Sequence, residues 1–221
     1  MNIDPEIAKE IIAKRVAQEL KDGQLVNLGI GLPCLAANYM VPGVNVIFQS
    51  ENGMINMGPR PEDGQGDPCI TNASGVNVTI LPGGAFFDSC MSFALIRGGH
   101  VDVTVLGTME VDQEGNIANW TIPGKLVTGM GGAMDLLCGA KKVIAATTHT
   151  AKGQPKILKK CTLPLSAEKE VDLIISEMAV IEVTKNGLVL REIHPETTLE
   201  EVRSLTDADL IVEGEIKKMN V

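Results

Sequence analysis

The feature that most constrains this chain is a repeated alternation of short apolar runs, glycine-rich turns and helix-like segments. Short apolar runs bounded by turns are typical of strands buried on both faces, and helices between them form the crossovers of a parallel sheet. The sequence therefore predicts an α/β fold in which helices flank an open, mostly parallel sheet. The strands are expected at Leu25–Leu28, Val44–Phe48, Val76–Leu81, Val101–Leu106, Val143–Ala146 and Leu173–Ile175.

The predicted helices carry recognisable end signals. Asp4 and Pro5 suit the start of the first helix, and Gly23 suits its end. Its apolar stripe at helical spacing comprises Ile7, Ile11, Ile12, Val16 and Leu20. Further helices are expected at Leu32–Met40, Asp88–Arg97, Ala133–Cys138 and Leu199–Ser204, the last opening with a capping box.

A different pattern occurs near the C-terminus. Ile181–Thr184 and Leu188–Arg191 alternate apolar and polar residues around Asn186-Gly187, which predicts an antiparallel hairpin. No repeat of fixed period, linker or low-complexity tract interrupts the chain. Residues 1–221 are therefore expected to form a single domain.

Charge and composition exclude several classes of function. The chain has 19 basic and 28 acidic residues, a net charge of −9, and 44% hydrophobic residues, so a disordered chain is excluded. The acidic balance argues against nucleic acid as a partner, because that affinity comes mainly from Lys and Arg. The start, MNIDPEIAKE, lacks the basic-then-apolar pattern of a signal peptide, and no segment is expected to enter a membrane.

The cysteines and histidines favour neither disulfides nor a metal site. Five cysteines, without a C-x-x-C pair, indicate buried thiols in a reducing compartment, so a cytoplasmic location is expected. The three histidines are far apart in the sequence, so metal chemistry is not expected.

Three turns at strand ends are candidates for a site, because ligands of open α/β sheets bind beyond the carboxyl ends of the strands. The first turn, residues 27–33, contains G-x-G but lacks the third glycine of the dinucleotide fingerprint, so a tight structural turn is the simpler interpretation. The third, residues 129–135, has three glycines in four positions ahead of a helix. Such a turn suits either an anion held by backbone N–H groups or close strand–helix packing.

The second turn places Glu51 where an apolar strand ends and a glycine turn begins. Most surface acids are simply solvated, but this one has no basic residue between Lys21 and Arg60 to pair with locally. Such a carboxylate suits a nucleophile or a proton carrier.

These residues resemble a known family. Phe48-Gln49-Ser50-Glu51-Asn52-Gly53 is similar to the glutamate signature in the B (beta) subunits of the family I (3-oxoacid type) CoA-transferases. Within that family, the chain is most similar to subunits of enzymes acting on butyrate, acetoacetate and acetate. Other segments resemble the family in the same order: residues 96–102, 118–120, 122–125, 129–135 and 160–165.

The resemblance implies a ping-pong CoA transfer between a short-chain acyl-CoA and a short-chain carboxylate. Glu51 would form an acyl-glutamyl anhydride and then a glutamyl-CoA thioester. Gly132 matches a backbone oxyanion-hole position, whereas Asn27, Asn119 and Gly131 match positions that line the substrate cavity. The resemblance implies no cofactor, since CoA is a substrate, and a partner alpha (A) subunit in an A2B2 heterotetramer.

One residue departs from the family pattern, and two other functions stay open. Asn56 stands where Gly or Ala is usual; if the position requires a positive φ, Asn is the best choice after Gly. A sugar-phosphate isomerase could use Glu51 as a general base, with the turn at 129–132 holding phosphate. A non-catalytic sensor of CoA esters would not depend on the Glu51 carboxylate.

Overall fold

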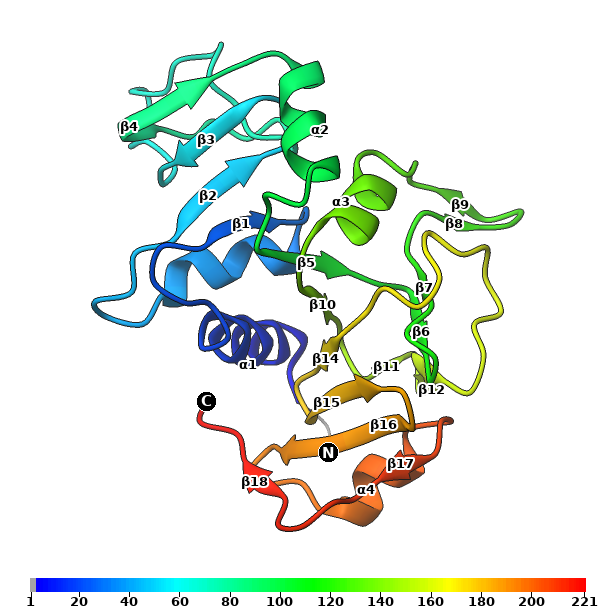
Figure 1. Ribbon diagram of the computed structural model, residues 1–221. Coiled ribbons are helices and arrows are strands. Elements are labelled where there is room, and N and C mark those ends of the chain that lie inside the picture. The colour runs from blue at the N-terminus through cyan, green and yellow to red at the C-terminus, as the bar shows by residue number, and fades with distance from the viewer. Residues whose placement is uncertain (1–2) are drawn as a thin grey trace.

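The computed structural model describes residues 3–221; Met1 and Asn2, at the start of the segment examined for a signal peptide, lie outside the described residues. The centre of the fold is a set of parallel strands that neighbour one another in a single sheet (Figure 1). In spatial order these strands are β2 (Ile47–Ser50), β1 (Leu25–Leu28), β5 (Val103–Gly107), β10 (Val143–Ala146) and β14 (Leu173–Ile175).

Antiparallel strands extend this sheet at both edges. Next to β2 lie β3 (Met54–Met57) and β4 (Ile80–Phe86). Next to β14 lie β15 (Ala179–Thr184) and β16 (Gly187–Ile193), and the short strands β17 (Leu210–Ile211) and β18 (Lys217–Lys218) run parallel to β16. The mostly parallel sheet and the C-terminal hairpin predicted from the sequence are both confirmed.

Helices cover both faces of the sheet. On one face, α1 (Pro5–Ala17) and the 3₁₀ helix η1 (Leu32–Tyr39) pack against β1, β5 and β10. On the other, α2 (Ser89–Arg97), α3 (Ala133–Gly139) and α4 (Leu199–Ser204) contribute to a second cluster of buried side chains. The Asp4, Asp88 and Thr198 side chains each accept a backbone N–H at the start of a helix, as the sequence predicts.

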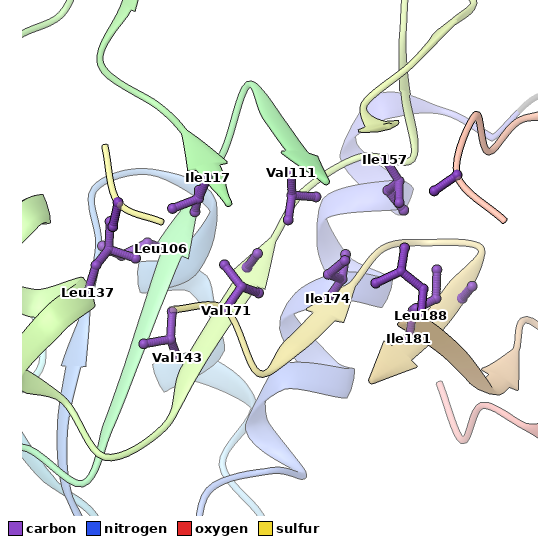
Figure 2. Close-up of a cluster of buried hydrophobic side chains, with 14 of the residues drawn as sticks. Leu106, Val111, Ile117, Leu137, Val143, Ile157, Val171, Ile174, Ile181 and Leu188 are labelled. Carbon is purple, nitrogen blue, oxygen red and sulfur yellow. The ribbon is translucent and has the colours of Figure 1, made fainter. Parts of the chain in front are cut away.

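The strands β10 and β14 are apolar throughout because both of their faces are buried. Successive residues of β14 alternate between the two clusters, with Leu173 and Ile175 in one and Ile174 in the other. Figure 2 shows part of the second cluster, where Val143 from the sheet lies near Leu137 from α3, and Ile174 lies near Ile181 and Leu188 of the C-terminal hairpin. Each such side chain stabilises the fold by about 1.5–3 kcal/mol relative to leaving it exposed.

Several predicted boundaries are wrong. The first helix ends at Ala17, and Ile7, predicted in its buried stripe, is 53% exposed. The predicted helix at 32–40 is a 3₁₀ helix at Leu32–Tyr39, and Gly31 before it supplies no side-chain cap.

The strand predictions err where pairing outweighs local pattern. The strand predicted at 44–48 lies at Ile47–Ser50, because its register pairs Leu25 of β1 with Ile47. The strand predicted at 76–81 lies at Ile80–Phe86 and includes Gly83 and Gly84, since it pairs with β3, which was not predicted.

Three small sheets, absent from the sequence prediction, lie beside the main one in the described part of the chain. They consist of β13 (Ile157–Leu158), β6 (Glu110–Asp112) and β7 (Ile117–Ala118); β8 (Thr121–Ile122) and β9 (Leu126–Val127); and β11 (Thr150–Ala151) and β12 (Gln154–Pro155). Of the helices formed by residues 3–221, none has the length and apolar character needed to cross a membrane.

Candidate active site

Glu51 lies in the tight turn that joins β2 to the antiparallel strand β3. The Gly53 N–H donates to the Ser50 carbonyl at 3.0 Å, and the Gly53 carbonyl accepts the Phe87 N–H at 3.0 Å. Gly53 has a φ of +123°, and a Cβ there would lie 2.0 Å from the Phe87 carbonyl oxygen. Only glycine fits this position, so the backbone on both sides of Glu51 is held rigidly.

The glycine turn before α3 meets the Glu51 side chain. The Gly132 N–H donates to Glu51 Oε1 at 3.1 Å. A Cβ on Gly132 would lie 2.8 Å from Glu51 Cδ, and one on Gly131 would lie 3.7 Å from Oε1. Residues 81 positions apart in the sequence therefore form one contact, in which the carboxylate lies directly against a glycine backbone.

The surroundings make the charged form of Glu51 less favourable than in water. Burial raises the pKa of the Glu51 carboxyl above its usual value, and the charge of Asp135 raises it further, while the Gly132 N–H lowers it. Among residues 3–221, no Lys, Arg or His nitrogen lies within ion-pairing distance of this carboxylate. It is thus a carboxylate with one hydrogen-bond donor, no counter-ion and reduced hydration.

A cavity of about 370 Å³ lies in front of Glu51. It is lined by all three turns singled out from the sequence: those after β1 and β2 meet because the carboxyl ends of these parallel strands share one edge of the sheet, and the turn before α3 lies against Glu51. Asn27, Asn119 and Gly131 line it together with Glu51 and Gly132. The structure therefore brings every residue proposed from the sequence into one cavity.

The two asparagines reach the cavity with part of their hydrogen-bonding capacity already used. Asn27 is buried, and its Nδ2 donates to Gln49 Oε1 at 2.7 Å. Gln49 Nε2 in turn donates to Ser92 Oγ at 2.9 Å. Asn119 Nδ2 donates to the Gly107 carbonyl at 3.2 Å, which ties the loop after β7 to the end of β5. These bonds fix the cavity wall before any substrate enters.

The sequence reasoning missed several lining residues. Gln49 lies on β2, two positions before Glu51 in the turn that follows, so strand alternation could have placed it near the site. Cys34 also lines the cavity, and its thiol donates to the Gly29 carbonyl at 3.1 Å. The prediction of buried thiols is wrong: Cys34 and Cys161 are half-buried, and Cys69, Cys90 and Cys138 are exposed.

Asn56 adopts the conformation that its identity suggests. Its φ is +60°, and its Nδ2 donates to the Pro82 carbonyl at 3.0 Å. The pairing of β3 with β4 shifts register between Ile55 and Met57, and Met57 lines the cavity. Asn56 thus preserves a left-handed bulge that directs the following residue toward the site.

Comparison with known proteins places these features in context. The family described as coenzyme A transferase matches residues 9–205. The chain is 53% identical to the beta subunit of the acetate CoA-transferase of Haemophilus influenzae over 216 residues, which cover 97% of this chain and 96% of that protein. It is 49% identical to the B-type subunit of the succinyl-CoA:3-ketoacid coenzyme A transferase of Helicobacter pylori, over 92% of this chain and 99% of that one.

The fold is also similar to that of a solved enzyme. The apoenzyme of the acyl-CoA transferase YdiF from Escherichia coli O157:H7 superposes with a TM-score of 0.78 at 26% identity, over the whole of this chain. This chain spans 45% of the length of YdiF. The family match weighs against both the sugar-phosphate isomerase and the non-catalytic sensor.

Proposed function

The chain belongs to the coenzyme A transferase family, as the beta subunit of a CoA-transferase, and from this premise we propose that Glu51 carries CoA as a covalent thioester. The transfer runs by a ping-pong mechanism between a short-chain acyl-CoA and a short-chain carboxylate. The observation that carries the proposal is the 3.1 Å hydrogen bond from the Gly132 N–H to Glu51 Oε1 at the edge of an open cavity.

In the first half-reaction, a Glu51 carboxylate oxygen attacks the thioester carbonyl carbon of the acyl-CoA. The carbon–sulfur bond breaks, CoA leaves as the thiolate, and an acyl-glutamyl anhydride forms. The thiolate then attacks the Glu51 carbonyl carbon. The first acid leaves as its carboxylate, and Glu51 is left as a thioester of CoA.

The second half-reaction reverses these steps with a new acid. The incoming carboxylate attacks the glutamyl thioester and releases the CoA thiolate, which then attacks the acyl carbon of the mixed anhydride. The new acyl-CoA leaves, and Glu51 returns as a carboxylate. Bonds and charges balance without a proton shuttle or an electron carrier, so we propose that no cofactor takes part and that CoA is only a substrate.

The Gly132 N–H has a defined role in this scheme. When the thiolate attacks the Glu51 carbonyl carbon, negative charge develops on the glutamyl oxygen, the type of atom that Gly132 already contacts. A preorganised donor of this kind stabilises an oxyanion by about 3–4 kcal/mol. Holding the carboxylate against the thioester lowers the activation barrier by roughly 7–11 kcal/mol more, because the translational freedom of the reactants has already been removed on binding.

The surroundings of Glu51 also favour its action as a nucleophile. A carboxylate without a counter-ion and with little hydration loses less solvation when it attacks than one in water. Burial and the charge of Asp135 raise the pKa of Glu51. The ordinary pKa of a glutamate carboxyl, about 4.3, lies well below neutral pH, so the carboxylate is the form available for attack.

The acids exchanged are proposed from the relatives and from the cavity wall. The matched relatives are named for acetate, succinyl-CoA and 3-ketoacids. The wall near Glu51 is largely apolar, with Leu28, Leu106 and Met130 among its members. We propose acetyl-, acetoacetyl- and butyryl-CoA as donors, with the corresponding short-chain carboxylates as acceptors.

A partner subunit completes the enzyme in this proposal. Relatives whose names designate them beta or B subunits imply an alpha subunit, and YdiF is more than twice as long as this chain. We propose an A2B2 heterotetramer in which the alpha subunit closes the cavity. A single domain over residues 1–221 and a cytoplasmic location, both predicted from the sequence, belong to the same proposal.

The direct test is to trap the covalent intermediate. The complex of the chain with its alpha subunit is incubated with acetoacetyl-CoA, and the intact beta chain is weighed by mass spectrometry. We expect the beta chain to gain the mass of a CoA thioester, to lose activity permanently when borohydride reduces that thioester, and to gain nothing in the Glu51→Gln variant. Turnover without any such species would overturn the mechanism, and no turnover with any of the proposed acids would overturn the substrate assignment.

A further inference from the structure

The helix α2 connects the two loops that meet at Glu51. At its start, the Phe87 N–H donates to the Gly53 carbonyl in the Glu51 turn, and Asp88 caps the helix by accepting the Met91 N–H at 2.8 Å. At its end, Arg97 Nε donates to Asp135 Oδ1 at 2.5 Å. One end of α2 is therefore bonded to the turn that carries Glu51, and the other to the helix that follows Gly132.

Asp135 lies in the first turn of α3, three residues after Gly132. The two helices are also in direct contact at the other end of α3, since a Cβ on Gly139 would lie 2.4 Å from the Ile96 carbonyl oxygen. The backbone contact fixes the end of α3, and the ion pair fixes its beginning. The beginning is the part that sets the direction of the Gly132 N–H.

Resting on the proposed function, we propose that Arg97 is a positioning residue for CoA transfer: through Asp135 it holds the first turn of α3 against Glu51 and neutralises the second carboxylate beside the nucleophile. Its side chain is 69% exposed, whereas that of Asp135 is 22% exposed. Arg97 does not line the cavity, so it acts only through its partner.

The charges around the site support the electrostatic part of this role. Asp135 raises the pKa of Glu51, and the Asp135 carboxylate in turn raises the pKa of the Arg97 guanidinium, which stays cationic. The other titratable groups around this pair are the thiols of Cys34 from η1, Cys90 from α2 and Cys138 from α3, together with His100 beside Gly98 and Glu170 beside Cys138. Arg97 is thus the cation that offsets the Asp135 charge.

The test follows kcat/KM against pH in the complex with the alpha subunit. Arg97→Gln is expected to lower kcat/KM near neutral pH by about tenfold, since misplacing a catalytic group by 1 Å can cost about 100-fold. The acid limb of the kcat/KM profile of Arg97→Gln moves to higher pH, because the negative charge of Asp135, no longer offset by Arg97, raises the Glu51 pKa further. Asp135→Asn moves the acid limb to lower pH, and the double variant follows Asp135→Asn alone.

Two further variants separate charge from general damage. Arg97→Lys keeps the cation and is expected to restore the acid limb while recovering only part of kcat. Lys141→Gln is the matched control, since Lys141 forms an exposed ion pair of 2.8 Å with Asp102, whose other oxygen accepts the Leu25 N–H at the opposite end of β1. We expect the control to change kcat/KM by less than twofold, because this pair is similarly exposed but contacts neither Glu51 nor the first turn of α3.

A second measurement does not depend on turnover. The Glu51 carboxyl is titrated by ¹³C NMR in the isolated chain, its resonance identified by its loss in Glu51→Gln. Arg97→Gln should raise the Glu51 pKa in the wild-type background and leave it unchanged in the Asp135→Asn background. An Arg97→Gln effect that is the same in both backgrounds, or no larger than that of Lys141→Gln, would overturn the proposal. Inactive wild-type complex with the expected titration would instead count only against the proposed function.

Discussion

Two titratable side chains, the half-buried Glu51 and the buried His149, lie along the same edge of the sheet, and they differ in how many of their hydrogen bonds are already made. Glu51 lies beyond β2, has one amide donor and faces a cavity. His149 lies beyond β10 and is 0% exposed, with a hydroxyl 2.9 Å from each of its ring nitrogens. Both side chains lie beyond the carboxyl ends of strands, so this position alone does not identify a reactive group.

The bonds around His149 define a neutral ring. Thr206 Oγ1 gives its proton to the Val202 carbonyl at 2.8 Å, so it accepts from Nε2. The Ser176 hydroxyl accepts the backbone N–H groups of Met178 and Ala179, and its own proton goes to Nδ1 at 2.9 Å, which is nearer than its other acceptor, the Ala179 carbonyl at 3.2 Å. We assign the Nε2–H tautomer on this basis.

A group with every bond made has no capacity left for a substrate. His149 ties the end of β10 to the turn before β15 and to the end of α4, and burial lowers its pKa to about 4. The Glu51 carboxylate instead has lone pairs that no protein donor occupies. The comparison teaches that unused hydrogen-bonding capacity beside open space, rather than burial or a shifted pKa, is what separates Glu51, the proposed nucleophile, from the structural His149.

The sharpest way to break this comparison is Glu51→Gln. The amide cannot form the anhydride, so transfer should fall by at least about 10⁴-fold, the scale seen when a nucleophile is removed. The melting temperature of the variant at pH 7 should be unchanged or slightly higher than that of the wild type. Burial raises the Glu51 pKa in the folded state, so the ionised carboxylate lowers the stability of the wild type at pH values above the unfolded pKa. A large loss of stability would place Glu51 with the structural groups.

The next largest effect is expected for Gly132→Ala. The new Cβ would lie 2.8 Å from Glu51 Cδ, so the carboxylate and the Gly132 N–H must move apart. Steady-state kinetics should show a loss in kcat of about 10²–10³-fold, as for removal of one oxyanion donor. Circular dichroism and the melting temperature serve as controls, and activity close to wild type would show that the contact is not used in the reaction.

A pH-dependence of stability tests the other half of the comparison. The folded pKa of His149 is about 4 against an ordinary value of 6.5, so the unfolded chain binds more protons between these values and stability falls as pH drops from 6.5 toward 4. The cost approaches about 3 kcal/mol at the lower end of this range, at 1.36 kcal/mol per pH unit.

The measurement for His149 is chemical unfolding of the wild type and of His149→Gln at a series of pH values. The variant should be less stable at pH 7, because it leaves buried hydroxyls with poorer partners, and its stability should depend less steeply on pH between 6.5 and 4.5. Transfer by the folded variant in the assembled enzyme should be retained. Parallel pH profiles for the two proteins would contradict the assignment of a neutral buried ring.

The smallest effect is expected at Asn56, beside the reactive turn. Ala at a φ of +60° costs about 1–2 kcal/mol, whereas Gly does not carry that steric cost. Asn56→Ala should therefore lower the free energy of unfolding by about this amount, and Asn56→Gly by much less. Equal losses in the two variants would show that the hydrogen bond to Pro82, and not the left-handed backbone, holds the bulge.

Local signals in the sequence predicted particular elements well. The capping box at Thr198 and Glu201 and the Asn186-Gly187 hairpin form as expected, since each depends on neighbours within a few residues. Glu51 was found because an acid follows an apolar strand and precedes glycine. The strand β4 was misplaced because its glycines are tolerated only through pairing with β3, which no local pattern reveals.

The sequence by itself determined that central parallel strands form and where the main helices start, because short-range sterics, capping and hydrophobic patterning act along the chain. Tertiary structure alone decided that Gly132 contacts Glu51, that Gln49 and Cys34 share its cavity, and that His149 is sealed between two hydroxyls. These contacts join segments far apart in sequence, and only the packing of the sheet and helices fixes which backbone amide reaches which oxygen.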